Sequence, residues 1–167
     1  MVYEPMEDSF LLAKDVKKHA SGKVLDMGSG SGILAHAAIK ASSISCTDID
    51  INAVNILRKR GLNAFHSNLF SSVTEKFDTI VFNPPYLPQD DYRAIDRTTI
   101  GGEKGNETIN HFLKDAKRHL NEDGKILILF SSLTPGVIEL FKKYGYEYKK
   151  LSEQNLFFET LYTYLLH

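Results

Sequence analysis

The chain has 167 residues, of which 43% are hydrophobic and 25% are charged. This length suits one folded domain with a substantial core, so we expect a single domain over residues 1–167. Twenty basic and 21 acidic side chains leave a formal charge of -1, which creates no overall field to attract nucleic acid. No apolar run approaches the roughly 18 residues that cross a bilayer, and the N-terminus lacks a signal-peptide pattern. We therefore expect a cytoplasmic protein that does not contact membranes.

Short strands alternate with helices along most of the chain. Apolar runs that end at polar, glycine or proline residues predict strands over 23–27, 44–48, 64–66, 78–82 and 125–130. Helical spacing of apolar side chains predicts helices over 8–19, 32–40, 52–60, 108–120 and 137–144. Residues 146–151 and 156–166, separated by Ser152-Glu153-Gln154-Asn155, predict a terminal hairpin. The pattern indicates an α/β fold with a doubly wound, mostly parallel seven-stranded sheet and an antiparallel C-terminal hairpin.

A glycine-rich loop follows the first predicted strand. Gly28, Gly30 and Gly32 alternate with serines, a composition that lets the backbone turn sharply and a ligand approach closely. Asp48 ends the second strand, where a carboxylate can accept hydrogen bonds from ribose hydroxyls. A nicotinamide-binding Rossmann domain also fits this pair. The GxGxG spacing favours another nucleoside ligand, as does Asp26, which would repel a pyrophosphate but could pair with an ammonium group.

A proline-rich tetrapeptide, Asn83-Pro84-Pro85-Tyr86, follows the fourth predicted strand. Two prolines cannot continue a central strand, so a rigid turn is the simplest interpretation. That interpretation explains neither the asparagine before the prolines nor the tyrosine after them. Residues 84–106 also form an irregular stretch of about twice the usual loop length, and long loops inside compact domains are usually functional.

These motifs together resemble the class I S-adenosylmethionine-dependent methyltransferases, a Rossmann-like family, of the kind that methylates planar amino groups. The opening Tyr3-Glu4-Pro5-Met6-Glu7-Asp8-Ser9-Phe10 is similar to that of the archaeal and eukaryotic HemK-related branch, the glutamine methyltransferases of translation release factors. Residues 101–106 resemble the G-G-x-x-G loop of the same branch. The resemblance extends from Tyr3 to about Leu120.

The resemblance implies how the acceptor amide would be held. Asn83 and Pro84 would accept its two N–H groups, and Tyr86 would lie against its plane, so these three are the expected catalytic residues. With Pro85 they form the expected substrate site. The implied cofactor is S-adenosylmethionine, with S-adenosylhomocysteine as product and no metal.

The resemblance also assigns ten residues to the methyl donor. Asp26 would hold its ammonium group, Asp48 its ribose and Leu69 its adenine ring. Asn68 stands where the branch usually has Asp, and its amide can both accept from the adenine amino group and donate to the ring. The full set is Ser9, Asp26, Gly28, Ser29, Gly30, Gly32, Asp48, Ile49, Asn68 and Leu69.

Other residues are expected to be structural. The six histidines show no metal-ligand spacing, and Cys46, the only cysteine, is expected to be a small buried side chain. The short third strand is a candidate sheet edge, where relatives of the branch dock a small zinc-binding activator subunit. An exposed Phe65 would suit such a partner, although an edge without a partner fits equally well. We expect four C-terminal aromatic residues to be core or sheet-face side chains: Phe157, Phe158, Tyr162 and Tyr164.

Several functions remain open. We favour methyl transfer to the glutamine of the Gly-Gly-Gln loop of a release factor. N6-adenine methylation of DNA would use the same tetrapeptide, but it needs base flipping and duplex-holding segments that this chain lacks. Protein lysine methylation needs amine deprotonation rather than amide activation. An inactive cofactor-binding scaffold is a further alternative, against which the intact Asn83 argues.

Overall fold

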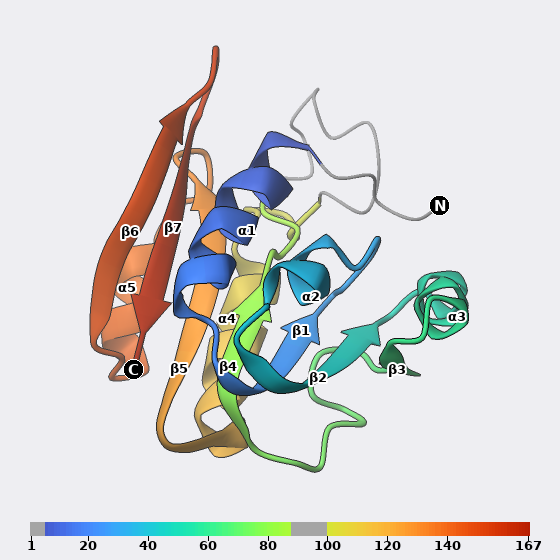
Figure 1. The fold of residues 1–167 in the computed structure, drawn as a ribbon. Coiled ribbons are helices and arrows are strands. Elements are labelled where there is room, and N and C mark those ends of the chain that lie inside the picture. The colour runs from blue at the N-terminus through green and yellow to red at the C-terminus, as the bar shows by residue number, and fades with distance from the viewer. Residues whose placement is uncertain (1–5, 88–99) are drawn as a thin grey trace.

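One seven-stranded sheet organises the computed structural model, which describes residues 6–87 and 100–167 (Figure 1). The strand order is β3-β2-β1-β4-β5-β7-β6. Strands β1 to β5 pair in parallel, whereas β7 is antiparallel to both β5 and β6. The predicted mixed sheet is therefore confirmed. The strands are β1 (Gly22–Met27), β2 (Ala41–Asp48), β3 (Asn63–His66), β4 (Phe77–Phe82), β5 (Leu120–Ser131), β6 (Tyr148–Asn155) and β7 (Thr160–Leu166).

Helices cover both faces of this sheet because the central strands carry apolar side chains on both faces. Leu25 and Phe82 point into the core beneath α4 and α5, whereas Val24 and Val81 point into the core beneath α1 and α2. Helix α3 packs on the face of α1 and α2, against buried Cys46. The helices are α1 (Glu7–His19), α2 (Ile33–Ala37), α3 (Ile51–Lys59), α4 (Glu107–Ala116) and α5 (Val137–Lys143), with a 3-10 turn, η2 (Lys117–His119), after α4.

An aromatic stack supports the end of β4, where the tetrapeptide begins. The ring of Phe82 lies 4.5 Å from that of Phe112 on α4, and Phe112 stacks on Phe70 at 5.3 Å. Phe112 is fully buried, together with Ile109 and Leu113 on the same helix face. Phe112 and Leu113 lie three and four positions after Ile109 along the chain, so these apolar residues lie on one side of α4. The helix is therefore amphipathic, with its apolar side against the sheet.

The C-terminal hairpin forms as predicted, but its turn lies elsewhere. The four residues expected to separate the strands belong to β6, and the turn spans 156–159, closed by a 2.7 Å hydrogen bond from Leu156 N to Glu159 O. The polar run does not end the strand because Ser152 Oγ donates to Asp15 of α1 at 3.1 Å. Phe157 and Phe158 in the turn are exposed, so their expected place in the core or on the sheet face is wrong.

Most of the side chains and elements expected to be structural lie where the sequence predicts them. Tyr162 and Tyr164 lie on the sheet face against Phe130, as expected. Strand β3 is a sheet edge, and Cys46 is buried, which raises the pKa of its thiol to about 12. Phe65 is half-buried rather than exposed, because it packs against the core. The predicted second helix ends early, at Ala37, because β2 already begins at Ala41.

Within residues 6–87 and 100–167, no helix combines the length and the apolar character that crossing a membrane requires.

Candidate active site

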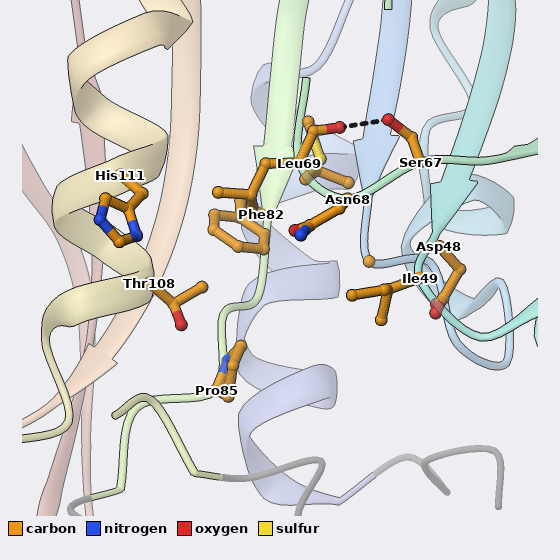
Figure 2. A pocket seen from close by; sticks show the side chains of 11 residues that line it. Asp48, Ile49, Ser67, Asn68, Leu69, Phe82, Pro85, Thr108 and His111 are labelled. Carbon is orange, nitrogen blue, oxygen red and sulfur yellow. Dashed lines mark hydrogen bonds between the residues drawn. The ribbon is translucent and has the colours of Figure 1, made fainter. Parts of the chain in front are cut away.

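A cavity of about 240 Å³ lies at the carboxyl ends of β1, β2 and β4, the edge at which open α/β sheets bind ligands (Figure 2). Eleven residues line it, and they include six of those predicted from the sequence. The predicted ones are Gly28, Asp48, Ile49, Asn68, Leu69 and Pro85. The others are Met27, Ser67, Phe82, Thr108 and His111.

The glycine loop turns in a conformation that suits glycine. Gly28, Gly30 and Gly32 have φ angles of 65°, 48° and 82°, in the left-handed region that side chains disfavour. A Cβ at Gly32 would also lie 2.8 Å from the Leu57 side chain, which would have to move to make room for it. Ser29 is buried within the loop, where its Oγ donates to the main-chain oxygen of Asp26 at 2.8 Å. The loop is thus a fixed wall of the cavity.

Asp48 is held in place by two main-chain amides. Gly30 N donates to its Oδ2 and Asp50 N to its Oδ1, both at 2.8 Å. Each carboxylate oxygen has a second lone pair, so Asp48 can still accept from a ligand in the cavity. Because one of these amides belongs to Gly30, Asp48 at the end of β2 is hydrogen-bonded directly to the glycine loop after β1.

Asp26 is the least solvated acid of the site. It has no exposed surface and does not line the cavity. Its Oδ2 accepts from Ala35 N at 3.1 Å, whereas its Oδ1 is buried without a hydrogen-bond partner among the described residues. Burial raises the pKa of Asp26 to about 7. An unpaired buried carboxylate oxygen beneath the glycine loop is what a cationic ligand group above that loop would stabilise.

A tight turn after β3 forms the opposite wall. Ser67 Oγ donates to Leu69 O at 2.6 Å, and Leu69 has a φ of 48°, which is unusual for a residue with a side chain. Figure 2 shows the amide of Asn68 between Phe82 and Ile49, directed into the cavity. Asn68 is exposed, so its side chain is available to a ligand.

Asn83 is oriented by the first turn of α1. Its Nδ2 donates to Asp8 Oδ2 at 2.9 Å and lies 3.5 Å from Ser9 Oγ. Asp8 is itself held, because its Oδ1 accepts from Ser9 N at 2.7 Å. Asn83 Oδ1 is buried and has no hydrogen-bond partner among the described residues. The Nδ2 donor of Asn83 is therefore bonded within the protein, and its Oδ1 is the part of the amide that could accept a further hydrogen bond.

The remaining predicted residues divide between the cavity and its surroundings. Ser9, predicted near the donor, lies against Asn83, and neither residue lines the cavity. Pro84 is buried, and Tyr86 is half-buried with its main-chain oxygen accepting from Thr134 Oγ1 at 3.0 Å. Pro85 is the member of the tetrapeptide that reaches the cavity.

The glycines of the G-G-x-x-G loop pack against the tetrapeptide. A Cβ at Gly101 would lie 2.5 Å from Pro85 O and 2.2 Å from Gly105 O, so only glycine fits there. Gly101 N also donates to Leu87 O at 2.9 Å. This loop therefore fixes the chain just after the tetrapeptide. Residues 88–99 of the long irregular stretch and Tyr3-Glu4-Pro5 of the opening motif lie outside the described residues.

Sequence reasoning missed three polar residues of this region. Asp8 belongs to the opening motif, which is its signal in the sequence, although the resemblance implies no role for it. Thr108 and His111 lie one turn apart on α4 and face the cavity across from Asn68 (Figure 2). The sequence predicted their helix but offered no signal for the side that reaches the cavity. Within the described ranges, no group of three or more His, Cys, Asp or Glu residues is placed to hold a metal ion.

The strand order, the glycine loop after β1 and the tetrapeptide after β4 define a class I methyltransferase fold. The family model named methyltransferase small domain matches residues 7–157. The chain therefore belongs to the methyltransferase small domain family, which confirms the family that the motifs predicted.

Two curated relatives are named for glutamine methylation. A protein of Methanocaldococcus jannaschii, whose name marks its protein N5-glutamine methyltransferase activity as inferred, is 37% identical over 145 residues, 80% of this chain and 74% of the relative. The release factor glutamine methyltransferase of Rhodopirellula baltica is 31% identical over 153 residues, 78% of this chain but only 52% of the relative.

Two further comparisons bear on the fold and the acceptor. One chain of the Mtq2–Trm112 complex of E. cuniculi, a complex described as responsible for methylating the termination factor eRF1, matches with a TM-score of 0.82 and 28% identity, over 99% of this chain and 97% of that chain. Ribosomal RNA small subunit methyltransferase C of Klebsiella pneumoniae is 31% identical over 83% of this chain, but the match spans only 40% of that enzyme.

The Asp8–Asn83 hydrogen bond yields a first prediction. Replacing Asp8 by Ala frees the Asn83 amide to rotate, and we expect kcat for methyl transfer to fall about 10- to 100-fold, the worth of a hydrogen bond to a charged group. Asp8→Asn keeps an acceptor and should lose less. Steady-state kinetics with Glu7→Ala, an exposed neighbour, as control provide the measurement. If Asp8 acts through Asn83, Asp8→Ala should cost nothing further in an Asn83→Ala background; an additional loss there contradicts this role.

The buried carboxylate of Asp26 yields a second prediction. Its folded-state pKa of about 7 lies above the ordinary value of 3.8, so the folded chain keeps a proton that the unfolded chain releases, and stability falls as pH rises between these values. Asp26→Asn removes this cost while keeping an oxygen for Ala35 N. We expect the variant to be about 1–4 kcal/mol more stable than wild type at pH 8, with the difference vanishing towards pH 4.

Urea unfolding of the ligand-free protein at several pH values measures this difference. Glu122→Gln, which neutralises an exposed carboxylate on β5, is the matched control and should not gain stability in the same way. An Asp26→Asn variant no more stable than wild type at pH 8 would show that the carboxylate is not strained.

Proposed function

We propose that this chain transfers a methyl group from S-adenosylmethionine to the side-chain amide nitrogen of glutamine in the Gly-Gly-Gln loop of a peptide chain release factor. The observation that carries this proposal is the oriented Asn83 amide, whose unpaired Oδ1 lies at the end of β4 beside the cavity-lining Phe82 and Pro85. Relatives named for glutamine methylation and the eRF1-methylating complex support a release-factor glutamine as the methyl acceptor. Residues 1–167 would act as one domain in the cytoplasm, where translation terminates.

The cavity offers complementary groups for the methyl donor. Asp48 has lone pairs free for ribose hydroxyls, and Ile49, Leu69 and Phe82 form apolar walls for an adenine ring. Asn68 can pair with the edge of that ring. When bound, S-adenosylmethionine supplies an electrophilic methyl group on a sulfonium centre.

The methionine part of the donor would lie over the glycine loop. Gly28, Gly30 and Gly32 give the loop its left-handed turns, and Ser29 keeps it in shape. The negative charge of Asp26 attracts the donor's ammonium group from beneath the loop, because its Oδ1 has no other described partner.

The tetrapeptide would activate the acceptor amide. An amide nitrogen is a poor nucleophile because its lone pair is delocalised, as the rotation barrier of about 18–20 kcal/mol shows. Asn83 Oδ1 and the Pro84 carbonyl accept its two N–H groups, which raises electron density on nitrogen and fixes its direction of attack. The Tyr86 ring lies against the amide plane and excludes water. No basic side chain is needed, because nitrogen loses its proton after it has become cationic, and positioning alone can contribute roughly 7–11 kcal/mol.

RNA is the alternative class of methyl acceptor that has to be compared with a protein acceptor. The likeness to ribosomal RNA methyltransferase C favours it, since guanine also presents a planar amino group. The formal charge of -1 argues against it, because RNA binding needs basic side chains to neutralise phosphates. Nothing in the site or in the relatives described above specifically supports DNA or lysine as the acceptor.

Labelled methyl transfer tests the proposal. We expect wild type to modify a purified release factor in preference to ribosomal RNA or duplex DNA, with mass spectrometry locating the methyl group on the Gly-Gly-Gln peptide. Asn83→Ala should lower kcat about 100- to 1,000-fold, as loss of an oriented polar group in an active site does. Donor affinity should change little, because Asn83 does not line the cavity.

Asn52→Ala, an exposed asparagine on α3, is the control for that experiment. Equal transfer by wild type and Asn83→Ala would overturn the assigned role of Asn83. Preferential labelling of RNA would overturn the protein acceptor while leaving the methyltransferase reaction intact.

We further propose that a small zinc-binding activator subunit docks at the β3 edge. The related Mtq2 forms a complex with Trm112. Strand β3 is four residues long and ends the sheet, and the exposed Ile51 lies just beyond the carboxyl end of the neighbouring β2. Exposed apolar side chains next to an unpaired strand edge suit a protein partner.

Co-purification with a Trm112-type subunit tests this interface. Ile51→Glu should abolish the complex, because a charge would be buried in it. Ile39→Glu is the matched control, since Ile39 is similarly exposed but precedes β2 at the opposite end of that strand. A complex that survives Ile51→Glu, or full activity of the chain alone, would contradict an activating role for this edge.

A further inference from the structure

The turn between β6 and β7 presents two neighbouring phenylalanines to solvent. Phe157 is 92% exposed and Phe158 is 63% exposed, and their rings contact edge to face with centroids 4.6 Å apart. We call residues 156–159 the aromatic tip. Single exposed apolar residues are common, but two adjacent phenylalanines on a closed turn form a patch of the kind that binds a partner.

The aromatic tip lies at the same edge of the sheet as the tetrapeptide. Ser131, which ends β5, pairs with Leu161 at the start of β7. Phe82, which precedes Asn83, pairs with Ile128 of β5. The tip therefore extends beyond the carboxyl end of β5, on the side from which an acceptor would approach (Figure 1).

The loop after β5 holds both the tip and the tetrapeptide. On one side, Ser131 Oγ donates to Glu159, and Ser132 N donates to Thr160 O at 2.8 Å. On the other side, Thr134 Oγ1 donates to the main-chain oxygen of Tyr86 at 3.0 Å. The same four-residue segment, 131–134, thus fixes the tip relative to the tetrapeptide.

The charges of the tip favour a protein ligand. Glu159 is the charged residue of the tip, which contains no Lys or Arg, and Glu153 of β6 is paired with Lys150. A platform for nucleic acid combines aromatic side chains with cations that neutralise phosphates, and this segment supplies only the aromatic part. On a partner protein, apolar side chains with neutral or basic neighbours would match the tip in both shape and charge.

We propose that the aromatic tip is a docking surface for the acceptor protein, where Phe157 and Phe158 cover an apolar side chain outside the methylated loop. This inference rests on the proposed function and adds a recognition site distant from the reacting amide. Because the segment 131–134 connects the two sites, binding at the tip holds the acceptor protein near Asn83 without orienting the reacting amide itself. An intact acceptor protein gains this contact, and a short peptide carrying only the Gly-Gly-Gln sequence does not.

The double variant Phe157→Ser/Phe158→Ser tests the docking surface. Both side chains are exposed in a turn, so their loss leaves the core intact. We expect Kd and KM for an intact release factor to rise about tenfold, which is the effect of losing about 1.4 kcal/mol of binding free energy. We expect kcat with that protein, and kcat/KM with a short Gly-Gly-Gln peptide, to change less than about twofold.

Ile39→Ser, an exposed apolar residue that precedes β2, is the matched control and should change none of these values. If the variant binds and methylates the intact protein as wild type does, the docking surface is overturned and the proposed function stands. An equal loss with protein and peptide also overturns it, because the effect would then lie at the reacting amide. If wild type neither binds nor methylates the release factor, or if the variant loses transfer to RNA instead, the protein acceptor fails together with this inference.

Discussion

The hydrogen bond from Asn83 Nδ2 to Asp8 is the interaction on which the rest of the site depends. It joins residues 75 positions apart and decides which end of the asparagine amide is already bonded within the protein. With the donor occupied by a carboxylate, the oxygen remains as an acceptor, and an acceptor is what a planar amino group requires. Helix α1, which carries Asp8, is also held at a second point, where the buried Asp15 accepts hydrogen bonds from Ser152 and Thr163 of the hairpin. The position of the Asn83 amide therefore rests on hydrogen bonds that join α1 to β4 and to the hairpin.

The other side of the site is organised around charge. Asp26 lies near the end of β1 and Asp48 ends the adjacent β2, yet only Asp48 is satisfied, by two main-chain amides at 2.8 Å. Asp26 is enclosed with one unpaired oxygen, and its pKa rises because burial disfavours the charged form. A chain selected for stability alone would have an amide or an apolar side chain there. The strain is understandable when a cation binds above the glycine loop, since the cation would offset the cost of burying the carboxylate.

Local sequence patterns foretold much of this molecule, and long-range contacts account for most of what they missed. Strand runs, the glycine loop and the tetrapeptide are signals carried by neighbouring residues, so their elements and their place at one edge of the sheet were predictable. The partner of Asn83 and the orientation of Thr108 and His111 depend on packing between distant segments. The hairpin turn was misplaced because a polar run was interpreted as a turn, although Ser152 in that run contacts a buried acid of α1.

The antiparallel end of the sheet places a turn at the same edge as the ligand cavity, which a purely parallel sheet could not do. Strand β6 runs in the same direction as β5, because both are antiparallel to the intervening β7. The turn from β6 to β7 must therefore lie at the carboxyl edge, where the ligand cavity also lies. A parallel seventh strand would instead require a crossover at that edge, with a connection leading away towards a helix. The reversal of one strand thus places a short, hydrogen-bonded turn at the same edge of the sheet as the tetrapeptide, and two exposed phenylalanines occupy it.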